Sequence, residues 1–128
     1  ALGTPLDSSL FRAAGEKRIL AYIGDSTNAE VPGRSGSEAS VEQGLLEEFR
    51  NCEGRIAVTL FSSNIGRIIS ISKAAEKCGR RVCVIGRSLH RMIGAALECG
   101  YMKNAPEFIN EEDLEDFRDK NIVVIVTG

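Results

Sequence analysis

The stretch RIAVTLFSSNIGRIISISKAAEKCGRRVCVI, residues 55–85, decides the fold. Its first seven residues are rich in β-formers and predict a strand from Arg55 to Phe61. Apolar residues then recur with a period near 3.6 over residues 65–75, which predicts a helix that Gly79 ends. A second strand is predicted from Arg81 to Ile85. A strand, a helix and a strand in this order predict a right-handed crossover between parallel strands.

The same alternation continues on both sides of this stretch. Further strands are predicted at Ile19–Ile23 and Ile122–Val126, with a weaker one at Glu107–Ile109, and further helices at Glu38–Asn51 and after the N-caps Ser88 and Asn110. Residues 1–16 are predicted to connect to this region, and residues 17–128 to form one domain. The expected fold class is α/β, a small Rossmann-like doubly wound and mainly parallel sheet of four to five strands with helices on both faces.

The composition excludes several classes of protein. With 128 residues, 43% hydrophobic and 27% charged, the chain fits one globular domain. No apolar run approaches the roughly 20 residues of a membrane helix, so we expect no membrane partner. The four cysteines form no CxxC pair and lie within apolar patterns, which predicts buried, reduced thiols in a cytoplasmic protein. Because the chain begins at Ala1 and stops at Gly128 after a short apolar strand, we expect a piece of a longer chain.

Charge is segregated along the chain. Residues 1–53 carry 5 Lys+Arg and 9 Asp+Glu, residues 54–103 carry 9 and 2, and residues 104–128 carry 2 and 7. The basic middle predicts attraction to polyanions, with solvated helix faces as the alternative. The single histidine, His90, is predicted to be solvated, and one imidazole excludes a histidine-rich metal site built from this chain alone.

Polar residues follow each predicted strand at its carboxyl end, the edge where open α/β sheets bind ligands. They are Asp25, then Ser62-Ser63-Asn64, then Arg87-Ser88, and finally Thr127-Gly128. The serines and Asn64 begin a helix whose first N–H groups lack partners, which favours an anion site, although a plain N-cap is equally open. Arg87 is a cationic candidate for a phosphate group, with an ordinary surface arginine as the alternative.

Two further candidates lie nearer the amino terminus. Asp25 could orient a histidine, transfer a proton or join a metal shell, while the alternative is an Asx-turn bonded to the amide of Thr27 or Asn28. Arg34 offers a guanidinium beside a capping box from Ser35 to Glu38, for which helix entry alone is favoured. No GxxxxGK[ST] loop and no GxGxxG fingerprint occur, which disfavours nucleoside triphosphates and dinucleotides as ligands.

Five motifs together are more specific than any of these residues alone. They are GDSTNA at 24–29, PGRSGSE at 32–38, GRI at 54–56, FSSNI at 61–65 with Arg67, and GRS at 86–88. In this order and spacing they resemble the β-CASP domain of bacterial ribonuclease J, within the metallo-β-lactamase superfamily, over nearly the whole chain. The resemblance implies an insertion into a lactamase domain that holds two zinc ions, the pair cleaving RNA both from a 5′-monophosphate end and internally. Residues 1–16 would then lead in from the lactamase domain.

The resemblance also implies roles for single residues. Asp25 matches an acidic motif near the metal centre and is expected to orient a histidine of the returning lactamase segment and to assist proton transfer. The residues expected along the path of RNA phosphate are Ser62, Ser63, Asn64, Arg67, Arg87, Ser88 and Arg34. No metal ligand is expected in this chain, because the histidine-rich metal motifs would lie outside it. Gly66 stands where many relatives carry histidine, so one phosphate contact is missing.

The function expected from the resemblance is that of an RNA-facing insertion domain of a zinc-dependent ribonuclease J-like hydrolase. Such an enzyme processes and degrades RNA as a 5′–3′ exonuclease and an endonuclease, and this chain alone would be inactive. Its partners would be RNA and its own lactamase domain, with homo-oligomerisation of the full-length enzyme left open. Two alternatives remain, a Rossmann-like module that binds sugar phosphates and a purely structural insertion.

Overall fold

The computed structural model describes residues 7–33, 36–103 and 106–127. Contacts between residues divide the chain into two units, with the division between Ser35 and Gly36. The strands, and every buried apolar side chain among the described residues, belong to the second unit. No helix within the described ranges is long and apolar enough to span a bilayer.

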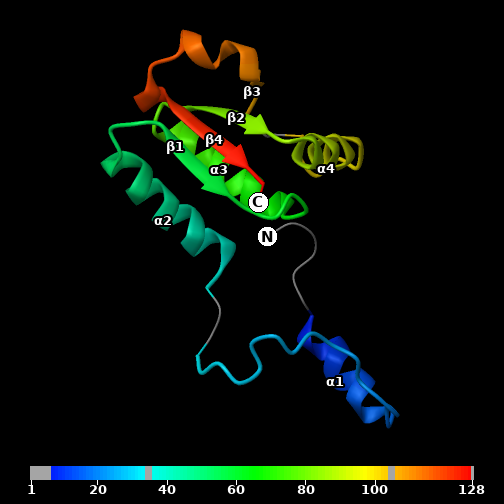
Figure 1. Cartoon of the computed structure of the whole chain (residues 1–128). Helices are drawn as coiled ribbons and strands as arrows, with labels where there is room; N and C mark the ends of the chain where they lie inside the picture. The colour runs from blue at the N-terminus through cyan, green and yellow to red at the C-terminus, as the bar shows by residue number, and fades with distance from the viewer. Residues whose placement is uncertain (1–6, 34–35, 104–105, 128) are drawn as a thin grey trace. The chain divides into compact units, whose positions relative to one another are not determined.

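A four-stranded, all-parallel sheet forms the centre of the second unit (Figure 1). Its strands are β1 (Ile56–Thr59), β2 (Arg81–Ile85), β3 (Phe108–Ile109) and β4 (Ile122–Val126), in the spatial order β1-β4-β2-β3. The last strand therefore inserts between the first two, with Ala57 and Cys83 both paired with Val124. This arrangement confirms the predicted α/β class, the parallel strands and the weak strand near Ile109.

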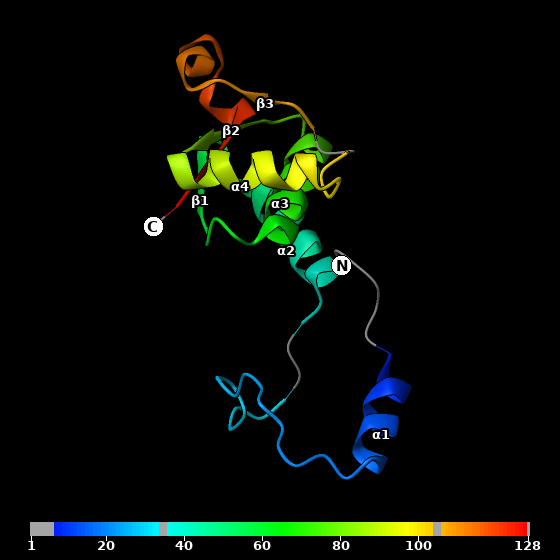
Figure 2. The ribbon, with the colours of Figure 1, turned by 90° about the vertical axis from the view of Figure 1, so that its right-hand side faces the viewer.

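Helices cover both faces of this sheet, unequally. The helices α2 (Glu38–Asn51), α3 (Ile65–Lys77) and α4 (Arg87–Glu98) form one layer, in which α3 contacts α2, α4, β2 and β4. The 3₁₀ helix η1 (Glu111–Asp116) contacts β2 from the opposite face of the sheet to these α-helices, as the orange segment of Figure 2 shows. A second 3₁₀ turn, η2 (Asp119–Asn121), leads into β4.

Side-chain alternation along the strands separates two buried layers. Val82 and Val84 of β2, with Val123 and Ile125 of β4, join the core cluster that the α-helices cover. The intervening residue Cys83 is fully buried outside that cluster and lies near the charge of Glu111 in η1. The near-continuous apolar sequence of β4 thus reflects burial on both faces, as predicted.

Local sequence signals explain most helix ends. Ser37 caps α2, because its hydroxyl accepts a hydrogen bond from the Ser40 N–H at 3.2 Å. Helix α3 stops before Gly79, which takes a positive φ of 68° that a residue without Cβ tolerates. The predicted bounds of α2 agree with the structure, whereas the predicted cap residue Ser35 lies outside the described residues. Asn110 precedes η1, but its side chain donates to Asp113 Oδ2 at 3.0 Å rather than capping the helix.

The first unit contains one helix and no strand among its described residues. Helix α1 (Ser8–Glu16) is capped by Asp7, whose Oδ1 accepts from the Ser9 N–H at 2.8 Å. The predicted strand Ile19–Ile23 is wrong: this segment has no strand pairing, and Leu20 and Ile23 are almost fully exposed. An apolar run signals a tendency to be buried, but a strand also needs a partner for its backbone groups. The proposed domain boundary at residue 17 stays a prediction.

Candidate functional site

The carboxyl edge of the sheet brings several predicted residues onto neighbouring strands. Since β1, β4 and β2 are adjacent and parallel, the residues that follow them emerge at the same edge. The Leu60 N–H donates to the Val126 carbonyl at 3.2 Å, and a Cβ built on Gly86 would lie 3.2 Å from Thr127 Cγ2. The predicted convergence is therefore observed for the segments after these three strands.

The turn after β1 is held by its own hydrogen bonds. The Asn64 N–H donates to the Phe61 carbonyl at 2.9 Å, and the Asn64 side-chain Oδ1 accepts from the Arg67 N–H at 3.0 Å. Asn64 is thus the N-cap of α3, which confirms the capping interpretation for this turn. Ser62 is half-buried and Ser63 is exposed. Their proposed contact with phosphate stays a prediction.

Arg67 is engaged by a carboxylate. Its Nε and Nη2 donate to the two oxygens of Glu38, at 2.8 Å and 3.3 Å. The hydrogen bonds from Arg67 hold the pKa of the Glu38 carboxyl below its usual value, and the same pairing raises the pKa of Arg67. The guanidinium predicted to meet RNA phosphate is therefore fixed in orientation, and two of its three nitrogens are already bonded. Sequence reasoning could not see this pair, since its members lie 29 residues apart.

A separate basic hollow lies at the start of α4. It has a volume of about 460 Å³ and is lined by Arg87, Ser88 and Arg91. All three side chains are exposed. The N-cap is Gly86, which makes no side-chain capping bond, so the prediction of Ser88 as the cap is wrong. Sequence reasoning did not select Arg91 for this site, although its position four residues after Arg87 places both on one face of a helix.

Asp25 belongs to the first unit, and Arg34 lies outside the described residues. The Asp25 Oδ1 accepts hydrogen bonds from the Thr27 N–H at 2.9 Å and the Thr27 hydroxyl at 2.5 Å. This is the Asx-turn that the sequence offered as the alternative. The Thr27 hydroxyl and N–H lower the pKa of Asp25, so the side chain is an exposed carboxylate at neutral pH. Its proposed part in catalysis stays a prediction.

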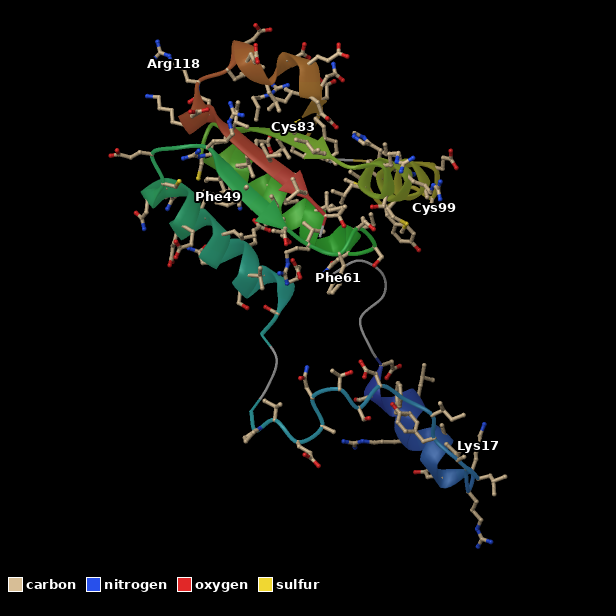
Figure 3. The ribbon with its side chains drawn as sticks, viewed as in Figure 1. Lys17, Phe49, Phe61, Cys83, Cys99 and Arg118 are labelled. Atoms are coloured by element: carbon tan, nitrogen blue, oxygen red, sulfur yellow. The ribbon has the colours of Figure 1, made fainter. Side chains whose placement is uncertain are left out.

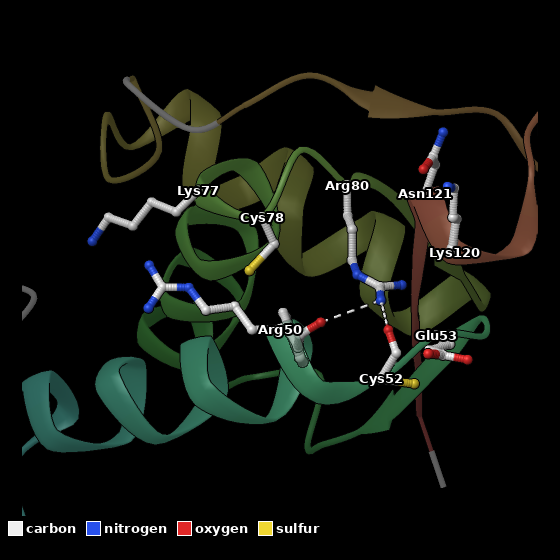
Figure 4. A pocket seen from close by; sticks show the side chains of 9 residues that line it. Arg50, Cys52, Glu53, Lys77, Cys78, Arg80, Lys120 and Asn121 are labelled. Atoms are coloured by element: carbon white, nitrogen blue, oxygen red, sulfur yellow. Dashed lines mark hydrogen bonds between the residues drawn. The ribbon is translucent and has the colours of Figure 1, made fainter.

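A larger hollow, of about 720 Å³, lies at the opposite, amino edge of the sheet (Figure 4). Its lining includes the buried Arg80, whose guanidinium donates to the carbonyls of residues at the end of α2 and the start of β1 and β4: Phe49, Cys52, Gly54 and Ile122. Lys77 in the same lining pairs with Glu42 at 2.6 Å. These cations offset helix-end carbonyls and a carboxylate, so the hollow is a structural feature rather than a candidate catalytic site.

Metal and thiol chemistry find little support in the part of the chain that the structure describes. No group of three or more His, Cys, Asp or Glu side chains there could hold a metal ion. All four cysteines are free thiols. Cys83 is buried, and this burial raises the pKa of its thiol. Cys52 and Cys78 are half-buried and Cys99 is exposed, so the predicted burial is confirmed for Cys83 alone and is wrong for Cys99. His90 is exposed as predicted and faces Glu111, with 3.7 Å between Nε2 and Oε1.

Comparisons with known proteins agree on one family. The family model described as "Ribonuclease J, beta-CASP domain" matches residues 53–128. Ribonuclease J of Sinorhizobium meliloti is 41% identical over 99% of this chain, which covers 22% of that relative. Ribonuclease J of Thermus thermophilus is 37% identical over 98%, and ribonuclease J2 of Bacillus subtilis is 32% identical over 100%. The chain spans between a fifth and a quarter of the length of these relatives.

Proposed function

The chain belongs to the ribonuclease J family and includes its β-CASP domain, and from this premise we propose that it forms an RNA-facing surface of a larger metal-dependent ribonuclease. The proposed substrate is RNA, held along its phosphate backbone by the carboxyl edge of the sheet. The proposed path includes the turn Ser62–Asn64 and the hollow at the start of α4.

The observation that carries this proposal is the basic hollow at the start of α4. Arg87 and Arg91 are exposed in it, and no carboxylate pairs with either within the described ranges. Gly86, the N-cap of α4, provides no side-chain cap, and the first N–H groups of a helix have no partner within the helix. Cationic side chains at a helix N-terminus suit a phosphate group.

Catalysis would require the rest of the enzyme. Among the described residues no group of three or more His, Cys, Asp or Glu side chains could hold a metal ion, and we propose that two zinc ions bind to other segments of the full-length protein. Asp25 is proposed as the acidic residue that this chain contributes near that centre, consistent with its exposed carboxylate. We expect the chain alone, with added zinc, to show no ribonuclease activity, and robust metal-dependent cleavage by it would contradict this assignment.

RNA binding is tested by measuring affinity for a 5′-phosphorylated single-stranded RNA across a range of salt concentrations. Affinity for RNA falls as salt rises, and each lost phosphate contact should make the negative slope of log affinity against log salt shallower by about 0.7. We therefore expect the double substitution Arg87→Gln with Arg91→Gln to weaken binding and to flatten the slope by about 1.4.

Arg118→Gln is the matched control, because Arg118 is an exposed arginine just before η2, at the amino edge (Figure 3). It should leave both the affinity and the slope unchanged. Equal effects of the control and the double substitution would contradict a phosphate path at the carboxyl edge. Binding of small sugar phosphates but not RNA would favour the sugar-phosphate module, and binding of neither would favour a structural insertion.

A further inference from the structure

Phe61 is an aromatic side chain that the core does not use. It lies two residues after the end of β1 and is 85% exposed, whereas Phe49 is 3% exposed. Within residues 36–127 as described, Leu97 and Tyr101 are the other exposed large apolar residues, at 53% and 57%. The exposed phenyl ring contributes little to the core, and at the carboxyl edge its face is accessible to a ligand.

The backbone that carries Phe61 is held in place. Its carbonyl accepts the Asn64 N–H at 2.9 Å, and the same asparagine caps α3 through the Arg67 N–H. The ring therefore projects from a hydrogen-bonded turn between a strand and a helix (Figure 3). A ligand that stacked on it would immobilise little of the chain, which lowers the entropic cost of binding.

The ring also lines a hollow of about 370 Å³ together with Thr59, Leu60, Asn64 and Arg67. Arg67 is fixed by Glu38 through Nε and Nη2, which leaves the N–H groups of Nη1 outside that pair. The Asn64 amide nitrogen is a further donor, because only its Oδ1 is used in the cap. The hollow thus combines an aromatic face with fixed polar donors, which is the combination that proteins use for unpaired nucleobases.

We infer that Phe61 stacks against a base of the bound RNA, with Asn64 and Arg67 beside it. This inference rests on the proposed function and adds a base contact to its phosphate path. Because every base has a π-face, the contact should tolerate any sequence.

The experiment measures the affinity of the chain for a 5′-phosphorylated single-stranded RNA at constant salt. Phe61→Ala should weaken binding by about 5- to 150-fold, the range of one lost stacked base. Phe61→Leu keeps an apolar side chain of similar exposure but no ring, so it should weaken binding as well. Phe61→Tyr should bind as the parent does. Circular dichroism should show an unchanged fold, since this side chain is exposed.

A second readout reports the stacking itself. The chain has no tryptophan, so Phe61→Trp introduces a single tryptophan at this position. RNA should quench its emission, while the matched variant Leu97→Trp, an exposed apolar position on α4, should respond little.

The outcomes separate this inference from the proposed function. Salt-dependent RNA binding that Phe61→Ala and Phe61→Leu leave unchanged would overturn base stacking and keep the phosphate path. Weakened RNA binding by Phe61→Ala together with full binding by Phe61→Leu would also overturn base stacking, because an apolar side chain without a ring would then suffice. No RNA binding by the parent chain would overturn both.

Discussion

Arg80 is a buried cation on which the amino edge of the sheet depends. It is 6% exposed, and its two terminal nitrogens donate to four backbone carbonyls that end α2 and begin β1 and β4. Removing the guanidinium would leave these partly buried carbonyls without partners. We expect Arg80→Ala to lower the free energy of unfolding by about 3 kcal/mol or more, measured by urea denaturation.

The neighbouring residue gives the control. Arg81 is exposed, so Arg81→Ala should change the free energy of unfolding by less than about 0.5 kcal/mol. Arg80→Lys should fall between the two, because an ammonium cannot reproduce the planar fork of donors. If Arg80→Ala and Arg81→Ala proved equally stable, the structural role assigned to the buried guanidinium would be wrong.

The ion pair of Glu38 and Arg67 makes stability depend on pH in one direction. The pKa of Glu38 is lowered from its ordinary 4.5 in the folded chain, so the pair stabilises the fold above that value and loses its effect as pH falls through the lowered pKa. At pH 7, Glu38→Gln should cost about 0.5–1 kcal/mol, since both side chains are partly exposed. The difference should shrink below pH 4.5 in urea titrations. A difference that stays constant down to pH 3 would contradict this account.

Residue-level roles that depend on local sequence were predictable, and those that depend on distant partners were not. Asn64 as a cap and Thr27 as the partner of Asp25 follow from spacings of two or three residues. By contrast, the bonds of Arg80 and the Glu38–Arg67 pair join segments more than 25 residues apart. Nothing in one sequence specifies which cation meets which acceptor at that separation, so Arg67 looked like a free cation.

At the scale of elements, the junction of β2 and α4 requires a glycine. Gly86 has φ 125° and ψ 134°, a conformation that side chains disfavour, and an added Cβ would crowd Thr127 at 3.2 Å. We expect Gly86→Ala to destabilise the fold by about 1–3 kcal/mol, measured by urea denaturation.

The matched substitution lies inside α2. Gly44 is exposed and has open space around its Cα, so Gly44→Ala should raise stability by up to about 1 kcal/mol through helix propensity. The same substitution, glycine to alanine, should then lower the free energy of unfolding at Gly86 and raise it at Gly44, which would assign the loss at Gly86 to backbone strain. A stabilising Gly86→Ala would show that the turn can relax.

Most elements followed from periodicity, and the exceptions have physical causes. The strands and helices of residues 36–127 were predictable because each one buries a face with its own period. The run Ile19–Ile23 has the composition of a buried strand, yet it pairs with no strand in the described structure. The start of α4 shifted from Ser88 to Gly86 because the backbone at glycine, rather than a hydroxyl, sets that turn.

For the whole molecule, the sequence predicted the edge of the sheet better than the site on it. Topology alone places the segments after β1, β2 and β4 together, because parallel strands share a direction. The surface of that edge divides into two hollows, one with Phe61 and Arg67 and one with Arg87 and Arg91. The packing of side chains separates the two hollows, and this packing cannot be predicted from the pattern of residue types along the sequence.

The domain boundary is the property of the whole chain that one experiment can decide. Every buried apolar side chain among the described residues lies between Leu46 and Ile125, whereas residues 7–33 are exposed apart from the half-buried Ala14. A core that is complete within one segment should form without the rest of the chain.

We therefore expect a chain of residues 36–128 to unfold in urea with the same free energy as the 128-residue chain, within about 0.5 kcal/mol. The m-value should also be the same, because it reports the surface exposed on unfolding. A chain of residues 17–128, intermediate in length, is the control and should behave identically. If removal of residues 17–35 lowered both the free energy and the m-value, the run Ile19–Ile23 would be part of the folded core, and the boundary predicted at residue 17 would hold.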